Sequence, residues 1–327
     1  MNIGTERSTL ATLTRVFSWA TLALLLVYLV SSVLTVTFEW PGPLEIFSGV
    51  FDVKSIVQLM LYAGAIAYGF YRGFESHAVS LRAESESISR FNTWLVRGAF
   101  FAVLFVGIGD AIISFMRVEN LLEATVGEQS ARDFGRSSWR GTYIHLPLIA
   151  LGFLVALVTR TLGFIWLSLL IVAAELLIVI SRFVFSYEQA FMGDLVRFWY
   201  AALFLFASAY TLIEEGHVRV DVFYASFSTR TKGIVNAIGS IFLGMVLCWT
   251  ILIIGLEKKS SIVYAPLRSF ETSQSGYGLY VKYLMAGFLA VFAITMLIQF
   301  VSYLLSAVAD LRDEPGHTDH ESSATQG

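Results

Sequence analysis

Long stretches without a charged side chain constrain this chain more than any other feature. Two runs, 98–116 and 161–181, are each interrupted by a single acid, Asp110 and Glu175 respectively. Six more contain no Asp, Glu, Lys or Arg: 16–38, 55–71, 141–159, 198–213, 233–256 and 283–309. A helix needs roughly 20 apolar residues to cross a bilayer, and continuous rather than alternating runs exclude a barrel of strands. The sequence therefore predicts an all-α, polytopic integral membrane protein with eight spanning helices.

Composition agrees with the membrane class and excludes several functions. Hydrophobic residues make up 56% of the chain and charged residues 14%, whereas soluble domains are about 25% charged. The one cysteine, Cys248, lies inside a span, so no disulfide framework forms within one chain. No basic stripe lies outside the spans to bind nucleic acid, and no phosphate-binding loop or catalytic triad spacing occurs. We expect a membrane-lipid environment, no enzyme activity and no cofactor.

Charge does not fix the orientation in the membrane. If the N-terminus were cytoplasmic, the inside segments would hold eleven of the 22 Lys and Arg residues, which is a tie. The even number of spans implies only that both termini lie on the same side.

The connections between the spans differ in character. The polar stretch LRAESESISRFNTWL (81–95) is typical of an amphipathic or surface-lying helix. The short TRTLG (159–163) predicts that the spans on either side form an antiparallel pair. His145, beside Pro147 at the head of a span, is interpreted as a hydrogen-bonded interfacial residue.

Two acids inside the spans are the first candidate functional residues. Asp110 precedes Arg117 by seven residues, and Glu175 precedes Arg182 by the same spacing, so each pair shares a helix face. Along the axis each pair is separated by about 10 Å, which favours interfacial anchoring or a polar contact between helices. The alternative is a self-sufficient ion-coupled carrier or channel that uses both acids, because ionisable residues in a membrane are costly.

The tetrapeptide GIGD (107–110) matches the Gly-x-Gly-Asp pattern of intramembrane aspartyl proteases. That chemistry needs two carboxylates that share a proton. Glu175 is the only other acid at span depth, so the protease is the third and weakest hypothesis.

The segment EEGHVRVDVFY (214–224) alternates polar residues with valines between two apolar runs. In an extended conformation His217, Arg219 and Asp221 point one way and the valines the other. A histidine and an aspartate alone are too few ligands for a metal site. The alternation favours a two-faced connection that fixes neighbouring spans, and a merely solvated loop is the alternative.

Half of the chain resembles a known family. The region 161–310 is similar to the small membrane subunit, DctQ type, of tripartite ATP-independent periplasmic (TRAP) transporters. The most specific part of the resemblance is GHVRVDVFY (216–224). Further matching elements are Arg182, Asp194, AYTL (209–212), Phe223 with Tyr224, the set Ser228, Arg230 and Lys232, and SFETSQSGYG (269–278).

The resemblance implies a domain organisation and a set of partners. Residues 1–160 would form a four-span N-terminal extension, 161–310 the four-helix DctQ-like domain, and 311–327 a disordered polar tail. Such a subunit works as a scaffold with a large permease subunit, which holds the substrate site, and with a periplasmic substrate-binding protein. The resemblance also implies the bacterial inner membrane, cytoplasmic termini and an organic acid as the cargo.

Overall fold

The structure, a computed structural model, describes residues 9–49, 51–75, 79–160, 164–187, 189–213, 224, 226–273 and 278–316. Its longer helices are α1 (Thr9–Thr37), α2 (Val53–Glu75), α3 (Leu81–Val118), α7 (Leu146–Val158), α8 (Phe164–Val184), α9 (Ala190–Ile213), α10 (Thr229–Gly239), α11 (Val246–Leu256) and α13 (Lys282–Leu311). Shorter elements are η1 (Glu45–Ser48), α4 (Leu122–Val126), α5 (Glu128–Phe134), α6 (Ser137–Arg140), η3 (Gly141–His145), η4 (Ser240–Met245) and α12 (Tyr264–Ser269).

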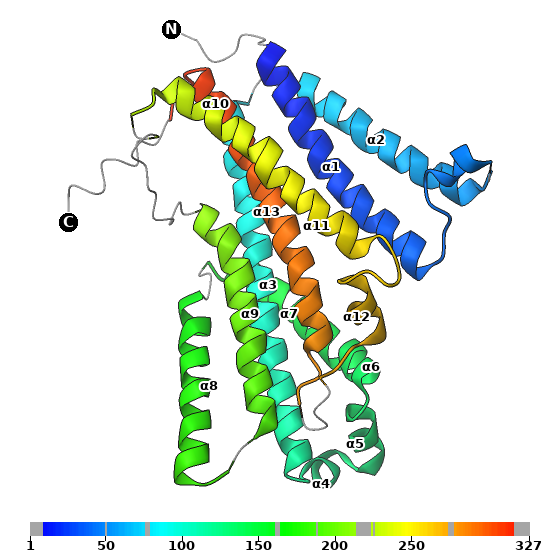
Figure 1. Ribbon diagram of the computed structural model, residues 1–327, viewed down its shortest axis with the longest axis vertical. Coiled ribbons are helices and arrows are strands. Elements are labelled where there is room, and N and C mark those ends of the chain that lie inside the picture. The colour runs from blue at the N-terminus through cyan, green and yellow to red at the C-terminus, as the bar shows by residue number, and fades with distance from the viewer. Residues whose placement is uncertain are drawn as a thin grey trace. The chain divides into compact units, whose positions relative to one another are not determined.

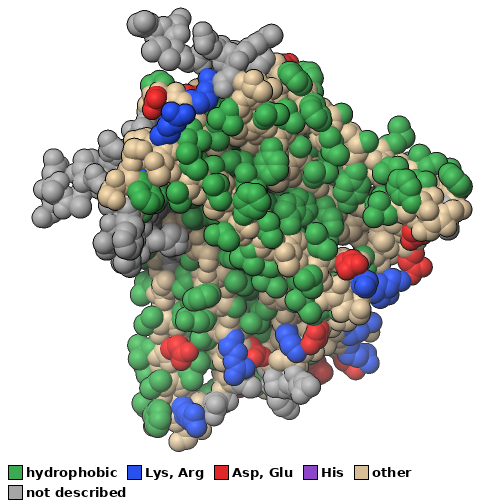
Figure 2. All heavy atoms as spheres, turned by 45° about the horizontal axis from the view of Figure 1, so that its top comes forward, with side chains coloured by type: hydrophobic (Ala, Val, Ile, Leu, Met, Phe, Trp, Pro, Cys, Tyr) green, Lys and Arg blue, Asp and Glu red, His purple; other side chains and the backbone are tan. Residues whose placement is uncertain are grey.

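Eight helical segments of the described residues are long and apolar enough to cross a membrane. Two of these segments consist of three consecutive elements each. The elements α6, η3 and α7 form the continuous helical segment Ser137–Val158, and α10, η4 and α11 form Thr229–Leu256. The described residues contain no strand. The predicted all-α, eight-span membrane fold is confirmed. Hydrophobic side chains cover most of the face seen in Figure 2, with charged side chains gathered toward its edges.

Contacts divide the chain into two compact units, and each draws on both halves of the sequence. The first unit comprises 1–90, 218–248 and 297–327, and the second comprises 91–217 and 249–296. The division at residue 160, which rests on the resemblance, therefore does not coincide with a boundary between compact units. It stays a prediction about which part of the chain is the family domain.

In the first unit, α1 and α2 form a closely packed pair, seen side by side in Figure 1. Glycine makes the approach possible, because a Cβ on Gly69 would lie 2.6 Å from the Cβ of Ala20. Polar side chains join the same two helices: Ser31 donates a hydrogen bond to Gln58, which donates in turn to the carbonyl of Pro41 at 2.8 Å. Small and polar residues at such contacts are typical of helix pairs in membranes.

The stretch 81–95 is not a separate surface helix. It forms the first part of α3, a single helix of 38 residues that continues into the third span. The predicted amphipathic helix is confirmed, since the buried residues Leu81, Glu84, Ser85, Ile88 and Asn92 recur at helical spacing, but this face is packed rather than surface-lying. The charge of Glu84 is tolerated there because its carboxylate lies 3.3 Å from Nε of Arg15. A polar residue that is paired in this way can occupy a packed helix face.

The same unit joins the start of α3 to the end of α13. Ser85 donates a hydrogen bond of 2.7 Å to the carbonyl of Ser302, and Arg82 lies 2.7 Å from the carboxylate of Asp310. Beyond α13, Arg312 and Glu314 form an ion pair of 3.3 Å, and the described part of the predicted tail ends at residue 316. Residues of the extension are thus joined to residues of the second half by direct polar contacts.

In the second unit, one apolar cluster joins helices from both halves of the chain. Its buried members include Phe100 on α3, Leu167 on α8, Phe198 on α9 and Phe288 on α13. The helix α8 packs along α9 (Figure 1). The antiparallel pairing predicted for the spans on either side of 159–163 stays a prediction. Residues 161–163 of that connection lie outside the described residues.

Candidate functional site

A fully buried carboxylate is the centre of a polar network in the second unit. Asp110 lies on α3 with no exposed side-chain surface, and three donors surround it. Its Oδ1 lies 2.8 Å from Nη1 of Arg140 and 3.1 Å from Nε2 of His145. The backbone N–H of Tyr280 donates to Oδ2 at 2.7 Å. Because a buried charge is costly unless it is paired and hydrogen-bonded, these donors explain how the acid is tolerated there.

A π-helical turn explains how Arg140 and His145 reach the same oxygen. In a regular α-helix, residues five apart point about 140° away from each other. The element η3 (Gly141–His145) begins directly after Arg140 and ends at His145, and it is π-helical, with bonds from residue i to i+5. This wider turn places residues five apart on nearly the same face, so both side chains meet Asp110.

The guanidinium of Arg140 has further acceptors besides the carboxylate. Its Nε and Nη2 donate to the carbonyl of Phe134 at 3.0 and 2.7 Å, and Nη1 also lies 3.3 Å from Oγ of Ser114. The guanidinium carbon lies 4.2 Å from the centre of the Tyr280 ring, a cation–π contact. The side chain of Arg140 is itself fully buried, so these contacts replace the water that the cation has lost.

His145 extends the network to α13. Its Nδ1 lies 2.8 Å from the hydroxyl of Tyr283, and both residues are buried. The carboxylate of Asp110 can only accept, so Nε2 of His145 carries a hydrogen. The other ring nitrogen, Nδ1, pairs with the hydroxyl of Tyr283, which can donate or accept. One carboxylate and one guanidinium thus lie in direct contact at the centre of the site.

Arg117 contacts the same tyrosine as Arg140. It donates a hydrogen bond to the hydroxyl of Tyr280, and its guanidinium carbon lies 4.7 Å from the ring centre. The seven-residue spacing on α3 brings Asp110 and Arg117 to one face but leaves about 10 Å between them. Tyr280 therefore links both residues of that face, through its backbone to Asp110 and through its side chain to Arg117.

Helix packing accounts for the two glycines of the GIGD sequence. A Cβ on Gly107 would lie 2.2 Å from Nε1 of Trp199 on α9, and one on Gly109 would lie 2.8 Å from a methyl carbon of Leu148 on α7. Both positions allow close approach of neighbouring helices, which is a common use of glycine in membrane proteins. In the described residues, the polar partners of Asp110 include no second carboxylate, so the arrangement is not that of an aspartyl protease.

Asp194 holds the loop that precedes α13. It lies near the start of α9, and its Oδ2 accepts hydrogen bonds from Oγ of Ser273 at 3.0 Å and from the backbone N–H of Leu279 at 3.1 Å. Residues 274–277 lie outside the described residues, and these two bonds are made on either side of them. One acid thereby fixes both described ends of the loop against α9.

The remaining predicted site residues lie elsewhere. Glu175 is exposed on α8, about halfway along the helix, and Arg182 is exposed in its last turn. In the described ranges, Glu175 makes no hydrogen bond or ion pair. An unpaired acid at the middle of a span costs about 3 kcal/mol on insertion scales. His217, Arg219 and Asp221 lie outside the described residues.

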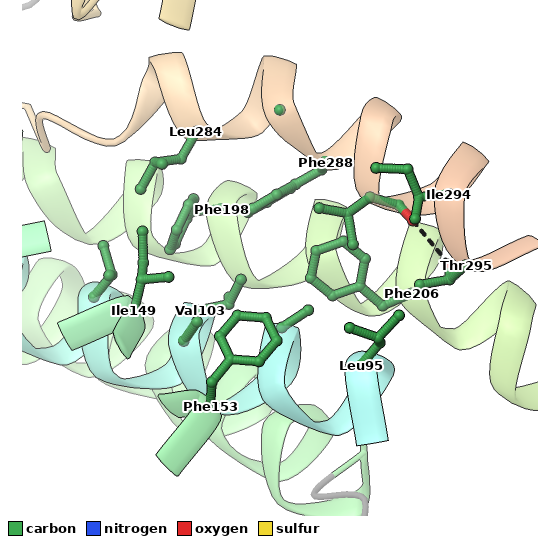
Figure 3. Close-up of a pocket in the computed structure, with 15 residues that line it drawn as sticks. Leu95, Val103, Ile149, Phe153, Phe198, Phe206, Leu284, Phe288, Ile294 and Thr295 are labelled. Carbon is green, nitrogen blue, oxygen red and sulfur yellow. Dashed lines mark hydrogen bonds between the residues drawn. The ribbon is translucent and has the colours of Figure 1, made fainter. Parts of the chain in front are cut away.

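A cavity of about 270 Å³ lies between α3, α7, α9 and α13 of the second unit (Figure 3). Phe153, Phe198, Phe206 and Phe288 point into it, and the only hydroxyl among its lining side chains belongs to Thr295. That hydroxyl donates to the carbonyl of Val291 at 2.8 Å, so it is already bonded. A cavity with this lining offers no group to hold a carboxylate or a sodium ion, whose sites need charged or polar ligands.

The buried network contains residues that sequence analysis missed. Arg140, Tyr280 and Tyr283 were not candidates, and His145, expected at the interface, is fully buried. No local sequence signal marks the two tyrosines. The spacing of Arg140 and His145, five residues apart at the head of a span, is visible in the sequence and could have indicated a shared partner. Within the described ranges, no three His, Cys, Asp or Glu side chains are grouped as metal ligands would be. What the network does is join α3 and η3 to the segment that leads into α13.

Comparison with known families finds a match in the second half of the chain. Residues 169–309 match the family model described as "Tripartite ATP-independent periplasmic transporters, DctQ component". The match extends from α8 to the end of α13 and so includes the last four candidate spans, while four further spans precede it. No curated protein and no solved structure matches the chain. The match confirms the resemblance found on the sequence.

Proposed function

Because residues 169–309 belong to the DctQ family of the tripartite ATP-independent periplasmic transporters, we propose that this chain is the small membrane subunit of such a transporter. In this role it supports uptake of an organic acid, driven by an ion gradient, without holding the substrate itself. The observation that carries the proposal is the family match over four consecutive spans. The N-terminal extension would add four spans, and two of its helices, α3 and α7, contact α9 and α13 of the matched region.

The arrangement of the acids supports a scaffold rather than a carrier. A coupling-ion site needs a carboxylate with coordination positions left for the ion. Both oxygens of Asp110 already accept from protein donors, and Glu175 lies on the exposed side of another helix. The carrier hypothesis requires Asp110 and Glu175 to bind the coupling ion together. Neither acid lies in an environment suited to binding that ion. The protease hypothesis lacks its second carboxylate.

Further features of the proposal follow from the family. The partners would be a large permease subunit and a periplasmic substrate-binding protein, and the location the bacterial inner membrane with both termini in the cytoplasm. His217, Arg219 and Asp221, in the most specific part of the resemblance, remain candidates for contact between subunits.

Co-purification tests the proposal directly. The affinity-tagged chain should be expressed together with the large permease subunit from its own genome and extracted in mild detergent. We expect the large subunit to be recovered with the tagged chain, and mass measurement of the native complex should give one copy of each. An unrelated tagged protein with eight spans is the control. Recovery of the tagged chain alone, from membranes that contain both proteins, would contradict the proposal.

A further inference from the structure

The helix α8 leaves most of its side-chain surface uncovered. Only 11% of the most apolar part of its span is buried, the smallest share among the eight spans of the described residues. Its buried residues Leu167, Ile171 and Ala174 lie on one side. The other sides expose large apolar side chains along the helix, from Ile165 at 84% to Phe183 at 78%. The helix therefore packs against the rest of the unit on one side and exposes a wide apolar surface on its other sides.

An acid interrupts this apolar surface at mid-span. Glu175 lies eleven residues after the first residue of α8 and nine before the last, about 16 and 14 Å along the axis. Neither distance allows its short side chain to reach the water beyond a helix end. Val172 and Val179, three before and four after, share its face and are also exposed. Lipid chains cannot hydrogen-bond to a carboxyl group, so lipid alone is a poor neighbour for this face.

We propose that the Glu175 face of α8, marked by Val172 and Val179, is where this chain binds a spanning helix of the large permease subunit. The partner helix carries a basic or hydrogen-bond-donating side chain at the depth of Glu175. This inference rests on the proposed function, since it assigns a contact surface to the partner named there.

The chemistry of the face selects this kind of occupant. Valines on both sides of the acid provide a narrow apolar surface on which a second helix can pack. A partner donor satisfies the carboxyl group, and the low dielectric of the membrane strengthens that bond. The water-soluble binding protein cannot reach a residue at mid-span. A second copy of this chain would place Glu175 against an identical acid across a two-fold axis, where like groups repel.

Photocrosslinking on the intact complex tests the surface. A photoactivatable phenylalanine analogue is placed at Val172 or Val179 in the full chain, which is co-expressed with the large subunit. Leu177 and Trp166 are matched controls: both are exposed on α8, at 55% and 64%, but lie about 200° and 180° from Glu175 around the helix. We expect adducts with the large subunit from 172 and 179 and little or none from 177 and 166.

Substitution of the acid supplies a second measurement. Glu175→Leu should weaken recovery of the large subunit about tenfold, the expected loss of one interhelical hydrogen bond in a membrane. Glu175→Gln keeps a hydrogen-bonding group and should retain most of the recovery. Folding is monitored by the elution of each variant as a single symmetrical species.

The outcomes distinguish this inference from the proposed function. If the wild-type chain recovers the large subunit but 172 and 179 give no adduct with it, the surface is wrong and the function stands. Adducts of twice the mass of this chain would show a second copy on the face and overturn the inference. Failure of the wild-type chain to recover any large subunit would overturn the proposed function as well.

Discussion

Replacing Arg140 with alanine should lower the free energy of unfolding by about 3–5 kcal/mol, because the carboxylate of Asp110 would remain buried without its cation. The ion pair is 2.8 Å long and both side chains are fully buried. Unfolding of the detergent-solubilised protein in mixed micelles measures the change. Arg90→Ala is the control, since Arg90 and its partner Glu86 on the same helix are 72% and 63% exposed and lie 3.8 Å apart. Its effect should stay below about 1 kcal/mol.

The charge balance of the site gives this prediction a further check. Replacing both members of the pair, as Asp110→Leu with Arg140→Met, should be less damaging than Arg140→Ala alone, because no unpaired charge is left buried. If Arg140→Ala is no more destabilising than Arg90→Ala, the buried pair does not stabilise the junction between α3 and α6.

Gly152→Leu should separate α3 from α7 and destabilise the protein by about 3 kcal/mol, the upper end of the usual cost of overpacking. A Cβ at Gly152 would lie 2.4 Å from the backbone nitrogen of Ala102 and 2.7 Å from its Cα. Backbone atoms cannot rotate aside as a side chain can, so the two helices must move apart. Thermal unfolding in detergent and the yield of folded protein measure the effect.

Gly64→Leu is the matched control for this change. Gly64 is an exposed residue of α2, and a Cβ there meets nothing within 4 Å. We expect the control to unfold at nearly the wild-type temperature. Equal losses at both positions would mean that leucine in a spanning helix, rather than contact with Ala102, causes the destabilisation.

The spans could be predicted from the sequence because the bilayer imposes a simple condition. A run of about 20 residues without charge is both necessary for a spanning helix and visible in the sequence. The family of the second half was equally accessible, since GHVRVDVFY is a local pattern. The amphipathic helix at the start of α3 could be predicted, but not that its polar face is packed, because Glu84 is tolerated through Arg15, 69 residues away in sequence. Pairing at that distance leaves no mark on the local pattern.

The site was less predictable than the fold for the same reason. Asp110 was recognised as costly, but its partners are Arg140, His145 and the backbone of Tyr280, up to 170 residues away. A regular helix would not have brought Arg140 and His145 to one acceptor, and the π-helical turn between them has no reliable sequence signal. Long-range contacts therefore determine whether an acid in a span is structural or free to act.

Transport measurement in proteoliposomes tests the central claim most directly. The chain is reconstituted alone, with the large permease subunit and binding protein, or omitted from that mixture, and uptake of a labelled organic acid is followed under an imposed sodium gradient. As the small membrane subunit of a tripartite transporter, the chain should give no uptake alone. Uptake should appear only when all three components are present and should be lost when this chain is omitted. Sodium-driven uptake by the chain alone would contradict the account and make Asp110 and Glu175 the first residues to examine in a carrier.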